Sequence, residues 1–308
     1  MNRRTIPFLG AAVLLAGVSL RTVAQQDPLF SQYMFNTLAF NPAYAGQADV
    51  LSFVGTLREQ WVGLDGAPST QCLAVNSPLR KQSLALGGLF LHDRIGPSRQ
   101  TAFYADFAYR IRTGENSRLA FGLSGGAMLY QADLSSLPTV EQDPANANIK
   151  GEWAPNFGFG MYWWSKRHYL GISAPKLLTN ELNATTGTIV SYGEARHYFL
   201  MGGMVFDLGR DVKFKPSFLL RAVEGAPFSA DINANFLLRE KLWFGGMYRL
   251  GNSFGIMFQY LITDQLRFGY AFDLTTTSMR AYNNGTHELM IGYDMRFAKG
   301  KAVSPRYF

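Results

Sequence analysis

Two stretches near the end of the chain alternate between large apolar residues and small or charged ones. From 266 to 274 the even positions are Leu, Phe or Tyr, and the odd positions are Arg, Gly, Ala and Asp. From 288 to 297 the same pattern recurs, with the apolar residues at the odd positions. A period of two over nine or ten residues predicts β-strands with two different faces. Large apolar residues on one face and small or charged residues on the other are typical of a barrel in lipid, so we expect Tyr270 to face lipid and Gly269 the lumen.

The same pattern extends back through the chain and predicts 14 strands. An even number suits a single-chain antiparallel barrel whose two ends lie on the same side of the membrane. The predicted strands are 50–60, 69–77, 82–92, 99–112, 117–132, 153–165, 167–174, 195–207, 212–222, 228–238, 241–250, 253–263, 265–274 and 286–297.

Connection lengths support an outer-membrane barrel. The connections after even-numbered strands are short, whereas several after odd-numbered strands are long, as at 133–152 and 175–194. Short turns at one end and long loops at the other are typical of outer-membrane barrels, with the long loops outside and the termini in the periplasm. A soluble β-sandwich gives no reason for this asymmetry. We therefore predict an all-β, transmembrane antiparallel barrel over residues 50–298, followed by a periplasmic tail, 299–308.

The first 24 residues resemble a secretory signal peptide. Arg3 and Arg4 precede an apolar run at 6–20, and small or short residues lead to Ala24, after which we expect cleavage. The run is too short for a spanning helix, which needs about 20 residues. Charged residues make up 17% of the chain, below the roughly 25% of soluble domains, as a lipid-facing surface requires.

Residues 25–49 precede the first predicted strand and differ from the rest. Asp27-Pro28 is typical of a helix start, and apolar residues recur at helical spacing, so we expect a short helix at 28–39. This segment is either a plug or lid at the periplasmic mouth or a linker packed on the rim.

Charges of both signs fall on positions predicted to face the lumen. Opposite charges in a low-dielectric wall pair with each other, which indicates an occluded or narrow lumen; alternatively these side chains line water. The predicted lumen charges are Arg58, Asp106, Arg110, Asp231, Arg267, Asp273, Asp294 and Arg296, with Arg112 and Glu288 at the same kind of position.

The sequence offers no catalytic set, metal site or cofactor motif. None of the four histidines has metal-ligand spacing to another His or to the single cysteine, Cys72. The formal charge of +7 is scattered rather than arranged in a basic stripe, so no nucleic-acid partner is expected. A triad assembled from distant positions leaves no local spacing; without such a signal we expect a non-enzymatic protein with no small-molecule substrate.

Three motifs resemble one known family. The first spans 25–46 and includes Gln32, Tyr33 and Asn41-Pro42-Ala43-Tyr44 before Gly46; the second spans 58–71. The third is the closing 285–289 stretch. The remaining motif residues are Arg58, Gln60, Trp61, Gly63, Pro68, Gln71, His287 and Glu288. Together they resemble the PorP/SprF family of the Bacteroidetes type IX secretion system over essentially the whole mature chain.

The resemblance implies an outer-membrane barrel that works with the type IX secretion machinery. Its implied partners are periplasmic ring or translocon proteins, or a secreted cargo such as an adhesin used in gliding motility. The motif residues are then candidate contacts for such partners. Because a folded 100-residue domain has a radius of gyration near 13 Å, we expect a docking or anchoring protein rather than a conduit. The alternative is an outer-membrane channel for small solutes.

The last predicted strand ends in an aromatic residue, Phe297, and we expect it to act as an assembly signal. Phe297→Ser should lower the amount of folded protein in the outer membrane, because it removes the aromatic end of this strand. Immunoblots of isolated outer membranes measure this, and wild-type levels of the variant would argue against the role.

Overall fold

The computed structural model describes residues 27–136, 148–182, 192–193, 195–224 and 226–295. The predicted signal peptide, the tail at 299–308 and the predicted lumen charge Arg296 lie outside these residues. The described strands are β1 (Leu51–Glu59), β2 (Ser69–Pro78), β3 (Leu84–Ile95), β4 (Ser98–Arg112), β5 (Ser117–Ala132), β6 (Ile149–Ser165), β7 (His168–Ala174), β8 (Glu181–Leu182), β9 (Tyr192–Gly193), β10 (His197–Met204), β11 (Phe206–Asp207), β12 (Val212–Val223), β13 (Ser229–Leu238), β14 (Leu242–Arg249), β15 (Ser253–Leu261), β16 (Leu266–Thr275) and β17 (Thr286–Met295).

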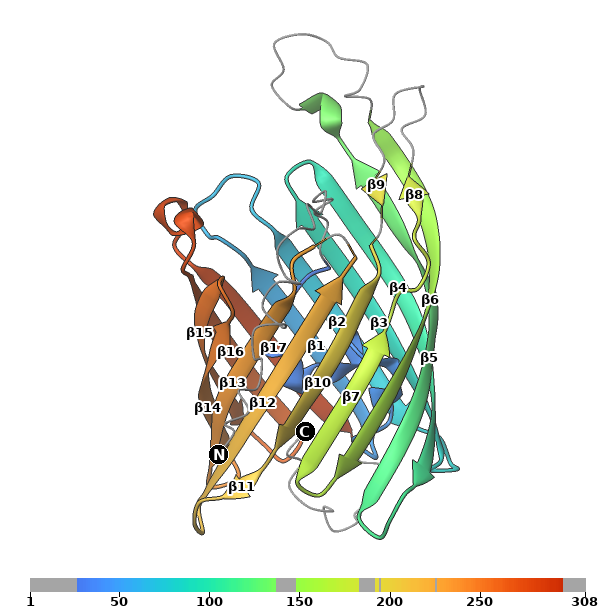
Figure 1. Cartoon of the computed structure of the whole chain (residues 1–308), viewed down its shortest axis with the longest axis vertical. Coiled ribbons are helices and arrows are strands. Elements are labelled where there is room, and N and C mark those ends of the chain that lie inside the picture. Colours follow the sequence, from blue (N-terminus) through green and yellow to red (C-terminus); the bar gives the residue numbers. More distant parts are fainter. Residues whose placement is uncertain (1–26, 137–147, 183–191, 194, 225, 296–308) are drawn as a thin grey trace, which may run out of the picture.

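The strands form a closed antiparallel barrel (Figure 1). Each barrel strand pairs with its neighbours in sequence, β10 pairs with β12, and β1 pairs with β17. Two-residue β11 continues the line of β10 along β12, and β8 with β9 forms a separate two-stranded sheet. The barrel therefore has 14 strands, as the alternation predicted.

The two ends of the barrel differ. We call the end with the short connections, such as 79–83 and 113–116, the turn end. We call the opposite end, with connections such as 60–68 and 276–285, the loop end. At the loop end β5 and β6 rise above the other strands (Figure 1), because they stay paired as far as Ala132 and Ile149. The sequence predicted that β6 begins at residue 153, four residues later than observed. Gly151 there has φ of +139°, and the register between β5 and β6 shifts between Tyr130 and Ala132.

Side-chain burial follows the predicted alternation. In β16, Gly269 and Asp273 are buried on the lumen side, and Tyr270 between them is partly exposed on the outside. In β17, Met290 is 2% exposed and its neighbour Ile291 is 57% exposed. The outer face of the barrel thus carries apolar residues, whereas the inner face carries small, polar and charged residues together with buried apolar ones such as Met290.

The N-terminal segment contains no α-helix, so the predicted helix at 28–39 is wrong. It forms three short 3₁₀ turns instead, at Tyr33–Phe35, Thr37–Ala39 and Pro42–Tyr44. Asn36 separates the first two, and its side-chain amide points to Thr56 and Cys72 on the barrel wall. The segment packs its apolar residues against the wall in more than one direction, with Phe35 against Trp243 of β14 and Phe40 against Phe199 of β10, so it has no single buried helical face. Among the described residues, no helix is long and apolar enough to cross a membrane.

The outward face of β15 provides a test of this arrangement. Ile256, near the middle of the strand, is 67% exposed, and Ile256→Arg should destabilise the barrel by roughly 2–4 kcal/mol, because it places a charge in lipid. The matched control is Tyr282→Arg, at a 69% exposed site in a 3₁₀ turn (Ser278–Tyr282) of the loop end. Denaturant titration in lipid vesicles measures both; equal effects would contradict the assignment of the lipid face.

Candidate functional site: the plug inside the barrel

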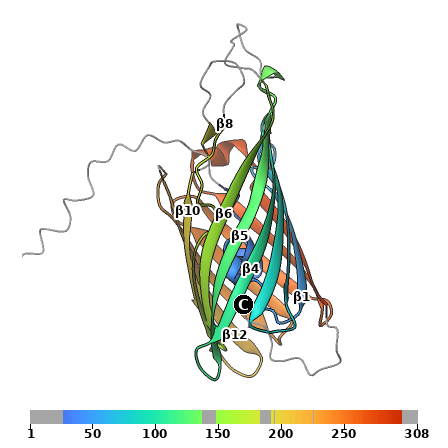
Figure 2. The same ribbon diagram turned by 90° about the vertical axis from the view of Figure 1, so that its right-hand side faces the viewer.

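Residues 27–49 lie inside the barrel, and we call this segment the plug. Its ribbon is visible between the strands, in blue, in both views (Figures 1 and 2). Five large apolar side chains of the plug are almost fully buried, and each contributes about 1.5–3 kcal/mol by leaving water. These are Phe30, Tyr33, Met34, Leu38 and Phe40.

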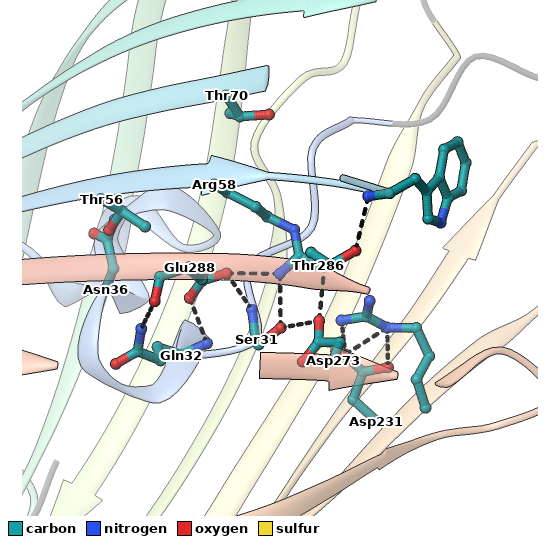
Figure 3. A network of polar contacts seen from close by, with 12 residues as sticks. Ser31, Gln32, Asn36, Thr56, Arg58, Thr70, Asp231, Asp273, Thr286 and Glu288 are labelled. Atoms are coloured by element: carbon teal, nitrogen blue, oxygen red, sulfur yellow. Dashed lines mark hydrogen bonds and ion pairs between the residues drawn. The ribbon is translucent and has the colours of Figure 1, made fainter. Parts of the chain in front are cut away.

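Arg58 of β1 binds both the plug and the last two strands, β16 and β17 (Figure 3). Its guanidinium lies 2.9 Å from Asp273 Oδ2 of β16 and 2.9 Å from Glu288 Oε2 of β17. It also donates to Ser31 Oγ of the plug at 2.7 Å. All three side chains of this ion network are buried.

Glu288 is the member of the network that binds the plug backbone. Its two carboxylate oxygens accept hydrogen bonds from the backbone N–H groups of Ser31, at 2.8 Å, and Gln32, at 2.9 Å. The Gln32 amide also donates to the Glu288 carbonyl oxygen at 3.4 Å. The plug therefore supplies donors that a buried carboxylate needs, and the wall supplies acceptors for backbone groups outside any regular helix.

The first described residue of the plug, Asp27, is held towards the loop end. Its carboxylate accepts a hydrogen bond from Lys176 Nζ at 2.7 Å, and its N–H donates to His197 Nε2 at 3.2 Å. Burial raises the pKa of the Asp27 carboxyl, but Lys176 and His197 outweigh it and lower that pKa to about 2. Asp27 is therefore ionised at neutral pH.

The Asn41-Pro42-Ala43 motif packs against strand glycines of the wall. Asn41 accepts from the Ala43 N–H at 3.0 Å and donates to the carbonyl oxygen of Met161 in β6, also at 3.0 Å. A Cβ atom at Gly122 of β5 would come within 2.1 Å of the Ala43 nitrogen. One at Gly160 of β6 would come within 2.1 Å of Asn41 Oδ1. These glycines allow the plug to approach the backbone of the wall closely.

The other end of the plug is fixed near the turn end. Gly46, with φ of +72°, donates its N–H to Asn76 Oδ1 at 3.0 Å. Its carbonyl oxygen accepts from Arg110 at 2.5 Å, and Arg110 also pairs with Asp49 at 2.8 Å. The plug is thus attached near both ends of the barrel.

The remaining predicted lumen charges divide into three groups. Asp231 pairs with Arg249 at 2.7 Å, and Arg267 pairs with Asp294 at 2.7 Å. Asp106 is buried beside a small cavity next to the plug. Arg112 is exposed at the end of β4.

The motif residues from Gln60 to Pro68 lie on the rim of the loop end. Trp61 donates its N–H to Thr286 Oγ1 at 3.2 Å, and the backbone of Val62 pairs with Gly285 and Asn284. The Gln60 N–H donates to the Pro68 carbonyl oxygen, and Gly63 has φ of +96°. The three sequence motifs therefore meet, although they are far apart in the chain.

Not every motif residue takes part in this meeting. Gln71 is exposed on the outer face of β2. His287 also faces outward, and its Nδ1 lies 2.7 Å from the Tyr270 hydroxyl. Inside, Tyr33 approaches Asn233 and Ser217, and the Tyr44 ring packs edge-on against Tyr162.

One buried residue of the site falls outside the predicted motifs and the predicted lumen charges. Lys215 of β12 is fully buried, with its ammonium 5.5–5.7 Å from the ring centres of Phe35, Tyr169 and Trp243. An ammonium so placed is attracted to the ring faces. The alternation of residues along β12 is consistent with an inward-facing Lys215. Only the fold brings the three rings together around it.

A small cavity lies beside the plug. The cavity between the plug and β3–β5, next to Phe199, has a volume of about 50 Å³. An apolar cavity that binds benzene has about 150 Å³. Among the described residues, no group of three or more His, Cys, Asp or Glu side chains could hold a metal ion.

These features define a class of protein: an outer-membrane β-barrel that holds its own N-terminal segment in its lumen. The chain belongs to the family described as type IX secretion system membrane protein PorP/SprF, whose model matches residues 22–293. The resemblance of the three sequence motifs to this family is thereby confirmed. No curated protein matches the chain.

Solved structures share the barrel fold. The toluene transporter TbuX of Ralstonia pickettii aligns with a TM-score of 0.54 and 10% identity, over 85% of this chain and 93% of its own. The CymD monoaromatic hydrocarbon channel aligns with a TM-score of 0.50 and 12% identity, over 87% of this chain and 94% of its own. At such identities the likeness shows the fold alone.

The ion network around Arg58 predicts a large effect of one substitution. Arg58→Met should destabilise the protein by about 3–5 kcal/mol, because it leaves Asp273 and Glu288 buried without their cation. The measurement is the urea midpoint of the folded band on unheated gels.

An exposed ion pair supplies the control for this substitution. Arg167 pairs with Asp207 at the turn end, and Arg167→Met should cost at most about 1 kcal/mol. Adding Asp273→Asn and Glu288→Gln to Arg58→Met should recover part of the loss. A midpoint for Arg58→Met as high as that of Arg167→Met would refute the stabilising role of the network.

Proposed function

We propose that this membrane component of the type IX secretion system acts by docking or anchoring other proteins, and that it is neither the conduit nor an enzyme. The observation that carries the proposal is the filled lumen. The plug is bonded to the wall at both ends, by Asp27 towards the loop end and by Gly46 and Asp49 towards the turn end. Barrels of 16–18 strands leave an aqueous channel only for small solutes, and this barrel has 14 and is plugged.

The ends of the barrel suggest how the protein faces its partners. Short turns lie on the periplasmic side of outer-membrane barrels and long loops on the outside. The turn end would then meet periplasmic ring or translocon proteins, and the loop end would meet a secreted cargo. The motif residues on the loop-end rim, Gln60 to Gly63, are candidate contacts for cargo. The predicted tail, 299–308, is a candidate contact on the periplasmic side.

The position of Asp27 supports removal of the predicted signal peptide after Ala24. Asp27 is half-buried in the lumen near Lys176 and His197, three residues beyond the proposed cleavage site. A retained leader would have to continue from inside the barrel. N-terminal sequencing of protein from outer membranes should find Gln25 as the first residue.

Conductance distinguishes a docking protein from a solute channel. Purified protein in planar bilayers should give no large, stable current steps, because the plug fills the lumen. A variant lacking 27–46 serves as the positive control for insertion and should conduct. Large, weakly selective steps from the wild-type protein would overturn the proposal in favour of a small-solute channel.

Co-purification tests the docking role itself. After cross-linking in native membranes, affinity purification of the protein should bring along periplasmic type IX components or a secreted cargo. Deletion of 299–308 should leave a folded, heat-modifiable barrel and reduce this recovery. Recovery of the barrel alone, in the wild type, would contradict docking.

A further inference from the structure

An open pocket at the turn end is unusually basic. It has a volume of about 380 Å³ and is lined by Gln82, Ser83, Tyr109, Arg110, Ile111, Arg112 and Arg118. Three of these residues are arginines and none is acidic. The pocket lies where the β4–β5 hairpin extends past the turn between β2 and β3. We call it the basic pocket.

The three arginines of the basic pocket are neighbours on two paired strands. Arg112 of β4 and Arg118 of β5 are direct partners in the antiparallel register. Arg110 lies two residues from Arg112 on the same face of β4, and its Nε has no hydrogen-bond partner among the described residues. Like charges directly opposite each other destabilise a strand pair. Such an arrangement gains stability from an anion that lies between the guanidinium groups.

The basic pocket already holds one carboxylate, that of the plug residue Asp49. Arg110 contacts it at 2.8 Å, and Arg118 contacts both of its oxygens at 3.3 Å. The Asp49 side chain is 46% exposed, so this carboxylate lies at the surface of the site. Arg110 and Arg118 contact this one carboxylate, and Arg112 adds a third guanidinium group to the lining. The pocket therefore keeps an excess of positive charge, with the planar donor geometry that suits further carboxylates.

We infer that the basic pocket binds an acidic segment of a periplasmic partner protein through its Asp or Glu side chains. The inference rests on the proposed docking function and names the chemistry of the partner. Arg110 and Arg118 turn towards the plug residue Asp49 on the inner side of the wall, whereas lipid headgroups surround the outer side. This direction favours a protein segment at the mouth of the barrel over an anionic lipid. The volume of about 380 Å³ accommodates several side chains.

The test uses the full-length protein in a neutral detergent and a fluorescein-labelled peptide of eight glutamates. Fluorescence anisotropy should show binding that weakens as salt rises, since the contacts are ionic and partly exposed. A labelled peptide of eight glutamines should not bind. The double variant R112E/R118E should bind the glutamate peptide at least tenfold more weakly.

The chain offers a closely matched control. Arg94 of β3 and Arg99 of β4 are also direct cross-strand partners, but they are exposed on the outer face at the loop end. The variant R94E/R99E changes the net charge by the same amount and should keep wild-type affinity. Equal loss in both double variants, or no binding by the wild type, would overturn the inference. Displacement of the peptide by short-chain phosphatidylglycerol at lower concentration would also overturn it, in favour of a lipid site.

Cross-linked co-purification separates this inference from the docking function. If the wild type recovers type IX partners and R112E/R118E recovers them equally, the basic pocket is not the contact although docking stands. If the wild type recovers none, the docking function fails whatever the peptide result. Selective loss of periplasmic partners from R112E/R118E, with R94E/R99E unaffected, supports both.

Discussion

Every backbone N–H and C=O group inside a bilayer needs a partner within the protein, and the structure depends on how this chain meets that requirement. The pairing of β1 with β17, from Leu51 opposite Met295 to Glu59 opposite His287, leaves no edge between the first and last strands. Closure has a second consequence, because it places Arg58 directly opposite Glu288. The pairing that satisfies the backbone thus also builds the ion network that holds the plug.

A closed lumen lined by charges is costly unless the charges find partners, and the plug supplies part of that compensation. The buried Glu288 carboxylate interacts with Arg58 and with two backbone N–H groups of the plug. Removing the plug would leave those acceptors unsatisfied and expose the apolar side chains that it buries. Wall and plug therefore stabilise each other, and the position of the plug in the lumen is what supports the proposed docking role over an open pore.

Much of the barrel could be predicted from the sequence, because strand alternation is a local property. The 14 strands and the inward position of Asp273 and outward position of Tyr270 follow from a period of two. The prediction of a helix at 28–39 was wrong because it also relied on a local pattern alone. Helical spacing of apolar residues assumes one buried face, whereas the plug is enclosed on all sides and Asn36 turns to the wall between two short 3₁₀ turns.

The sequence by itself determined which residues face the lumen, and it placed both charge signs there. Only the tertiary structure decided which charges meet. Arg58 contacts Asp273 across 215 positions and Glu288 across 230, and Lys215 lies among rings from three separate elements. Alternation fixes the direction of a side chain within its own strand, but the partners across the lumen depend on register and closure, which arise from pairings between distant segments.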